Sequence, residues 1–172
     1  MPLTARRSWR PLSNTALSTF LVALAATLGV VPAARAQCGP QWLTGQGSPG
    51  PGFTNAVLEW DRDGAGPQAP VWVFGGSFTI AGGVSASNIA LFDGDRWHAL
   101  GAGVNSTVTS LAVLADGRLV AGGFFNSAGG APASRVAAWN GTSWSALDTG
   151  VGGAVSSLLA MPDGSLIAGG VF

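Results

Sequence analysis

The sequence predicts an all-β protein built from a repeated unit of four antiparallel strands, and three observations support this fold class. Glycine pairs recur at Gly75-Gly76, Gly122-Gly123 and Gly169-Gly170, which sets a period of 47 residues. Each unit contains two Asp-Gly or Asn-Gly turn signals. Glycine accounts for 27 of the 172 residues and charged residues for only 9%, a composition that suits tight-turned β structure and is unlike that of a disordered chain.

The repeat is well defined in the second half of the chain. Residues 75–121 and 122–168 agree at 22 of 47 positions without a gap, and the shared positions include Trp97 with Trp144. Self-similarity at a fixed period of this length is the signature of a repeat architecture.

Two turn signals divide each complete unit into strands. One lies between a short apolar run and a tryptophan, at Asp93-Gly94 and Asn140-Gly141; the other separates two longer apolar runs, at Asp116-Gly117 and Asp163-Gly164. We expect type I′ hairpin turns, which need a positive φ at both central residues. In the second complete unit the predicted strands cover residues 118–124, 134–139, 143–147, 154–161 and 165–169.

A divergent unit precedes these two, over about residues 42–74. Its apolar runs parallel those of the later units, but six residues, Ala65–Pro70, are inserted between them. A further unit begins at Gly169. Several runs are apolar on both strand faces, which indicates sheets that are covered on both sides.

These motifs, GGSFTIAGG, IALFDGDRWHALGAGV and VLADGRLVAGG, resemble the kelch-like, delta-60-type repeats of secreted bacterial β-propeller proteins. The resemblance covers about residues 42–172 and implies a partial β-propeller of four-stranded meander blades. The chain would supply about 2.5 blades, whereas propellers close with about 4–8. We therefore expect a fragment of a longer protein or a chain that self-associates. The glycine pairs are expected where blades converge. With no Tyr and a single His, the copper site of the galactose oxidase type has no match.

The first 36 residues have the pattern of a secretory signal peptide. Three arginines lie in the first ten residues, an apolar run covers residues 16–31, and Ala34 and Ala36 stand at the −3 and −1 positions of a cleavage site. A membrane anchor is the alternative, but this run is shorter than the roughly 20 residues that a spanning helix needs. We therefore expect residues 37–172 to be secreted, periplasmic or displayed at the cell surface, with no membrane span after cleavage.

Charge and cysteine content restrict the function classes. After residue 36, four Arg stand against eight acidic residues, a formal charge of −4. The arginines are scattered, so the pattern argues against nucleic-acid binding, which needs clustered cations. Cys38 is the single cysteine. It cannot form an internal disulfide, and its pairing state stays open.

Two aspartate clusters and one histidine are candidate sites. Asp61-Arg62-Asp63-Gly64 and Asp93-Gly94-Asp95 offer oxygens of the kind that Ca²⁺ prefers. Each cluster falls at a predicted hairpin and lacks EF-hand spacing, so turn formation is the favoured interpretation. His98 follows Trp97, and the next unit has Ser145 in its place. The repeat does not require His98, and we expect a surface residue.

Five tryptophans could stack on sugar rings or pack between sheets. Trp97 and Trp144 recur at equivalent positions, which favours packing, and Trp139 is grouped with them. Trp60 and Trp72 are less constrained by the repeat and are expected to be more exposed.

No residues are assigned to catalysis, cofactor binding or metal binding. The leading hypothesis is a non-enzymatic exported module that provides a binding or structural surface for a glycan or a protein. Further blades, or a second copy of the chain, are expected as structural partners. One alternative is part of a secreted carbohydrate-active enzyme whose catalytic residues lie outside this chain. Another is a spacer repeat of a cell-surface protein.

Overall fold

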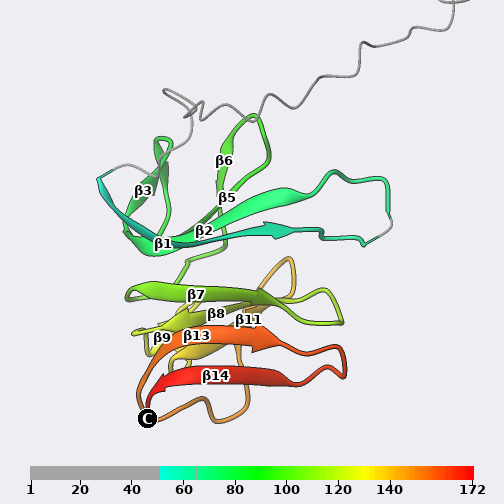
Figure 1. Cartoon of the computed structure of the whole chain (residues 1–172). Coiled ribbons are helices and arrows are strands. Elements are labelled where there is room, and N and C mark those ends of the chain that lie inside the picture. The colour runs from blue at the N-terminus through cyan, green and yellow to red at the C-terminus, as the bar shows by residue number, and fades with distance from the viewer. Residues whose placement is uncertain (1–50, 65) are drawn as a thin grey trace, which may run out of the picture. The chain divides into compact units, whose positions relative to one another are not determined.

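The computed structural model describes residues 51–64 and 66–172, and the expected all-β class is confirmed there (Figure 1). By internal contacts the chain divides into Met1–Trp42 and Leu43–Phe172, and every described residue belongs to the second unit. The predicted signal peptide and Cys38 lie outside the described residues. Within the described part, no helix is long and apolar enough to cross a membrane.

Two four-stranded antiparallel sheets and one two-stranded sheet follow each other along the chain. The first sheet has the order β1-β2-β5-β6, and the second has the order β7-β8-β11-β12. The first consists of β1 (Gly52–Trp60), β2 (Val71–Phe78), β5 (Ile89–Phe92) and β6 (Trp97–Ala99). The second consists of β7 (Val108–Val113), β8 (Leu119–Gly123), β11 (Val136–Trp139) and β12 (Trp144–Ala146). The third pairs β13 (Ala154–Ala160) with β14 (Leu166–Val171).

The predicted meander order and strand positions agree with these sheets, and strand ends differ by no more than two residues in the second complete unit. One element was not predicted. A two-stranded hairpin is inserted between the second and third strands of each four-stranded sheet, as β3 (Ile80–Ala81) with β4 (Val84–Ser85), and as β9 (Ser127–Ala128) with β10 (Ala131–Pro132). These strands have two residues each, too short to leave a periodic pattern in the sequence.

The predicted type I′ turns are wrong. Among the described turn dipeptides only the glycines have positive φ, for example 100° at Gly94 and 83° at Gly117. In the Gly94-Asp95 turn the positive φ lies at the first central residue, as in a type II′ turn. The turn that ends at Gly117 has three residues and places the glycine in the left-handed conformation of a G1 bulge.

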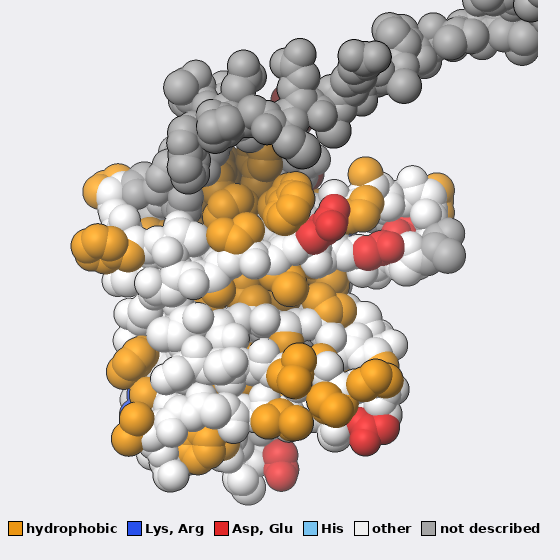
Figure 2. All heavy atoms as spheres, in the orientation of Figure 1, with side chains coloured by type: hydrophobic (Ala, Val, Ile, Leu, Met, Phe, Trp, Pro, Cys, Tyr) orange, Lys and Arg blue, Asp and Glu red, His pale blue; other side chains and the backbone are white. Residues whose placement is uncertain are grey.

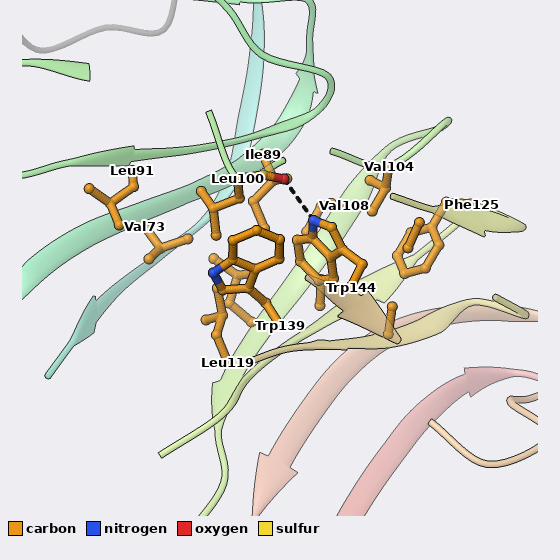
Figure 3. Packing of buried hydrophobic residues seen from close by; sticks show 14 of the residues in the cluster. Val73, Ile89, Leu91, Leu100, Val104, Val108, Leu119, Phe125, Trp139 and Trp144 are labelled. Carbon is orange, nitrogen blue, oxygen red and sulfur yellow. Dashed lines mark hydrogen bonds between the residues drawn. The ribbon is translucent and has the colours of Figure 1, made fainter. Parts of the chain in front are cut away.

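The sheets pack face to face through their first strands, so that β7 lies between β1 and β13 (Figure 1). A core of buried apolar side chains fills the first junction, where Val73 and Ile89 of the first sheet meet Leu119 and Trp139 of the second (Figure 3). A second core joins the second and third sheets around Val120, Val155 and other residues. Both faces of the second sheet are therefore covered by neighbouring sheets, as its strands with apolar residues on both faces predict.

The first glycine of two of the pairs, Gly75 and Gly122, lies against a side chain of the next sheet. A Cβ atom on Gly75 would lie 2.5 Å from Cγ1 of Val108, and one on Gly122 would lie 2.8 Å from Cγ1 of Val155. Gly75 and Gly122 are 47 residues apart, and so are Val108 and Val155. The same glycine therefore accommodates the same valine of the next sheet at both junctions.

Candidate functional site

A pocket of about 250 Å³ opens at the junction of the first and second sheets. Its walls come from the ends of strands β1, β5, β6 and β11 and from the turns that follow β1, β5 and β11. The residues that matter for its chemistry are Trp60, Arg62, Asp93, His98, Leu100 and Trp139. Segments nearly 80 residues apart in the sequence therefore meet in one concave site.

Two tryptophans form the apolar part of the pocket and are held by the surrounding fold. Trp60 is only 3% exposed, and its indole Nε1 donates a hydrogen bond of 2.9 Å to the carbonyl of Gly117 in the second sheet. The rings of Trp139 and Trp144 lie 5.4 Å apart, centroid to centroid. Trp144 Nε1 donates to the carbonyl oxygen of Leu100 at 2.7 Å (Figure 3). These contacts fix the positions of the tryptophan rings at the pocket wall.

The exposure predicted for Trp60 is thus wrong, because its indole bridges two sheets. For the other four tryptophans, the expected burial or exposure is confirmed. Trp97, Trp139 and Trp144 are buried, and Trp72 is 46% exposed. Of the tryptophans considered for sugar stacking, Trp72 therefore offers the most accessible surface.

The polar rim of the pocket centres on Asp93 and His98. Asp93 Oδ1 accepts hydrogen bonds of 2.9 Å from the backbone N–H groups of Asp95 and Arg96, and Oδ2 lies 2.7 Å from Nε2 of His98. The two backbone donors, and then the His98 contact, hold the pKa of the Asp93 carboxyl far below its usual range. Asp93 is therefore an ionised acceptor, and Nε2 of His98 must carry the hydrogen of their bond.

Each polar rim residue is particular to the first sheet. Asp93 has Asn140 at the equivalent position of the second sheet and His98 has Ser145, whereas Arg62 lies in the turn between β1 and β2, which is longer than the turn between β7 and β8. Asn140 Oδ1 accepts from the N–H groups of Thr142 and Ser143 just as Asp93 Oδ1 accepts from its own turn.

The fold therefore needs a side-chain acceptor at this turn, but it needs neither a carboxylate nor an imidazole. His98 is exposed, as predicted. Its hydrogen bond to Asp93 and their joint place at the pocket were not foreseen.

The predicted turn role of the aspartate clusters is visible in their hydrogen bonds. Asp61 Oδ1 accepts from the N–H of Asp63, and Asp63 Oδ2 accepts from the N–H of Gln68. Among the described residues, no group of three or more His, Cys, Asp or Glu side chains gathers in an arrangement for a metal ion. Asp61 Oδ1 and Asp63 Oδ2 therefore shape the loop after β1, and Asp63 Oδ1 is buried without a hydrogen-bond partner.

The pocket combines polar hydrogen-bonding groups with apolar walls. Arg62 and His98 supply donors, Asp93 supplies an acceptor, and the tryptophans supply apolar contact. Glycoside hydrolysis commonly uses two carboxyl groups, one of which has a raised pKa. The pocket lining contains one carboxylate, Asp93, and its pKa is lowered.

Arg62 was considered only as part of a loop cluster. Its place in the same pocket as His98 has no signal in the sequence, because the two residues lie 36 positions apart in different hairpins.

No family model, no curated protein and no solved structure matches this chain. The kelch-like, delta-60-type resemblance therefore stays a prediction from the repeat motifs.

Proposed function

We propose that this chain is part of an exported β-propeller and acts as a non-enzymatic binding module, with a glycan held at the pocket between the first two sheets. The observation that carries the proposal is that three polar side chains, Arg62, Asp93 and His98, line one pocket beside buried tryptophans.

The propeller part of the proposal is supported by the stacking of successive meander sheets through their first strands. On this interpretation, the described strands correspond to about 2.5 four-stranded blades. The signal-peptide pattern of residues 1–36 supports export to the periplasm, the cell surface or the medium.

A glycan fits the pocket better than a purely apolar ligand. Sugar hydroxyls both donate and accept hydrogen bonds, and the rim offers a guanidinium, an imidazole and a carboxylate next to tryptophan side chains. Small-ligand sites commonly combine apolar walls with a few placed polar groups. The exposed ring of Trp72 on β2 provides additional surface for stacking.

A glycan-array screen of the full chain, followed by calorimetric titration of the best ligand, tests the proposal. Two variants remove rim groups: His98→Ser, which installs the residue of the next unit, and Arg62→Ala. Each should weaken binding by roughly 10- to 150-fold, because hydrogen bonds to charged groups contribute about 1.5–3 kcal/mol. Arg118→Ala is the matched control, because Arg118 is paired with Asp116 outside the pocket lining.

Three results would contradict the proposal. Binding that is unchanged in both rim variants would move the glycan site away from the pocket. The absence of any glycan ligand would favour a protein partner or a spacer role. Hydrolytic or oxidative turnover of a bound glycan would favour the carbohydrate-active enzyme.

A further inference from the structure

The outer face of the third sheet exposes apolar side chains that the fold covers elsewhere. Val155 and Leu158 of β13 point into the core shared with the second sheet. Leu159 and Ile167 belong to the opposite face and are 57% and 53% exposed. Hydrophobic side chains gather over β13 and β14 in Figure 2. Contiguous exposed apolar surface of this kind marks an interaction site.

The second sheet shows what covers this face one repeat earlier. Ala112 and Val120 stand 47 residues before Leu159 and Ile167, and both are buried in the core formed with the third sheet. The outer face of the second sheet is thus covered by a following strand pair of the same repeat. The outer face of the third sheet has the same positions, with larger apolar side chains.

The glycine that accommodates the next sheet is also present. The Cβ position of Gly122 is crowded by Val155 and Leu158, with a closest approach of 2.8 Å. Gly169, the equivalent residue of β14, has only Ser157 Cβ near its Cβ position, at 4.0 Å. The space that a valine fills in front of Gly122 is open in front of Gly169.

A hydrogen-bond donor recurs at the same junctions. The first strand of each sheet has a bulge, and its extra residue is Asn55 in β1, Thr109 in β7 and Ser156 in β13. Asn55 Nδ2 donates to the carbonyl of Val108 at 3.1 Å, and Thr109 Oγ1 donates to that of Val155 at 2.5 Å. Each donor thus reaches the backbone of the following sheet.

Ser156 is exposed and has a hydroxyl at the equivalent place. The third sheet therefore presents a donor of the same kind toward the side on which a following sheet would lie.

From these equivalences we propose that the outer face of β13–β14 is an interaction surface for a further unit of this same repeat. That unit contributes a strand with valine against Gly169, leucine three residues later, and a valine carbonyl that accepts from Ser156. Both existing partners have this pattern, Val108 with Leu111 and Val155 with Leu158. The β1 strand of a second copy matches it poorly, because it has Thr54 and Val57 at those positions.

An extended chain tests the proposal directly. A copy of residues 126–172 placed after Phe172 continues the repeat in register, because Gly122–Phe125 align with Gly169–Phe172. We expect Tm to rise by at least about 5 °C, since neighbouring repeats stabilise each other through their interface. Amide exchange at β13 and β14 should slow.

Matched alanine variants then identify the contact. Gly169→Ala should be tolerated in the original chain, where its Cβ meets open space, and should lower the Tm of the extended chain by about 3–8 °C. Gly122→Ala should lower Tm in both chains. Leu159→Lys combined with Ile167→Lys should leave the original chain folded and abolish the rise in Tm that the added unit produces.

Other outcomes overturn the proposal. Equal tolerance of Gly169→Ala in both chains would mean that the added unit does not pack on this face. If the added unit stays unprotected in amide exchange, it likewise does not pack on this face, because the same sequence forms hydrogen-bonded strands at residues 126–172. An original chain that is dimeric, with β13–β14 protected, would identify a second copy as the occupant. The pocket lies between the first and second sheets. If no glycan binds there, the inference about the third sheet is unaffected.

Discussion

The hydrogen bond from Thr109 offers a direct test of how the sheets are joined. Thr109 Oγ1 lies 2.5 Å from the carbonyl oxygen of Val155 in the third sheet and 3.1 Å from that of Gly122 in its own sheet. Thr109→Val keeps the shape of the side chain but removes the hydroxyl. A part-buried carbonyl then loses its donor, so we expect the free energy of unfolding to fall by about 1–3 kcal/mol.

The assay is equilibrium urea unfolding followed by tryptophan fluorescence, because the buried tryptophans of the neighbouring core become exposed when the stacked sheets unfold. Thr109→Ser keeps the donor and should cost less than about 1 kcal/mol through the lost methyl group. Ser156→Ala changes the equivalent residue of the third sheet, which is exposed. That variant should stay within about 0.5 kcal/mol of the parent chain.

The reasoning fails if Thr109→Val unfolds at the same urea concentration as the parent chain. It fails equally if Thr109→Ser and Thr109→Val are destabilised to the same extent, because the hydroxyl would then contribute nothing. A large effect of Ser156→Ala would show that this donor already has a partner in the isolated chain.

Three further predictions concern the turns and the junctions. Trp144→Phe removes the bond to the buried Leu100 carbonyl and should cost about 2 kcal/mol in thermal or urea unfolding. Gly122→Ala forces a Cβ against Val155 and should cost about 1–3 kcal/mol by the same measurement. Asp93 has a lowered pKa in the folded chain, so its stabilisation is present above about pH 4 and is lost as pH falls below that value. Asp93→Asn, which keeps the turn acceptor, should therefore narrow the difference between urea midpoints at pH 7 and pH 3.

Much of the strand layout could be predicted because it depends on local sequence. Gly117 and Gly164 end three-residue turns in a conformation that glycine adopts without steric cost, and the apolar runs between turns have strand length. The details of the turns were less accessible. The central residue after Gly94 keeps negative φ, so a single glycine suffices where two positive φ values were expected.

The candidate site was only partly predictable from the residues that form it. Asp93 and His98 were singled out separately, one as a possible cation ligand and the other as a surface residue. Their hydrogen bond requires the hairpin between β5 and β6 to place residue 98 beside residue 93. Arg62 joins them because β1 and β5 end at the same pocket. Neither the Asp93–His98 hydrogen bond nor the place of Arg62 at this pocket can be recognised from a sequence motif.

The sequence by itself determined the period of 47 residues, the positions of the main strands and the presence of a glycine at each close junction. These features are local, since turns, apolar runs and glycine pairs act over a few residues. Tertiary structure alone decided that Trp60 is buried, because its partner Gly117 lies 57 residues away. It also decided that Val155 fills the space in front of Gly122 whereas Gly169 faces open space, because equivalent local sequence meets a neighbouring sheet in one place and not in the other.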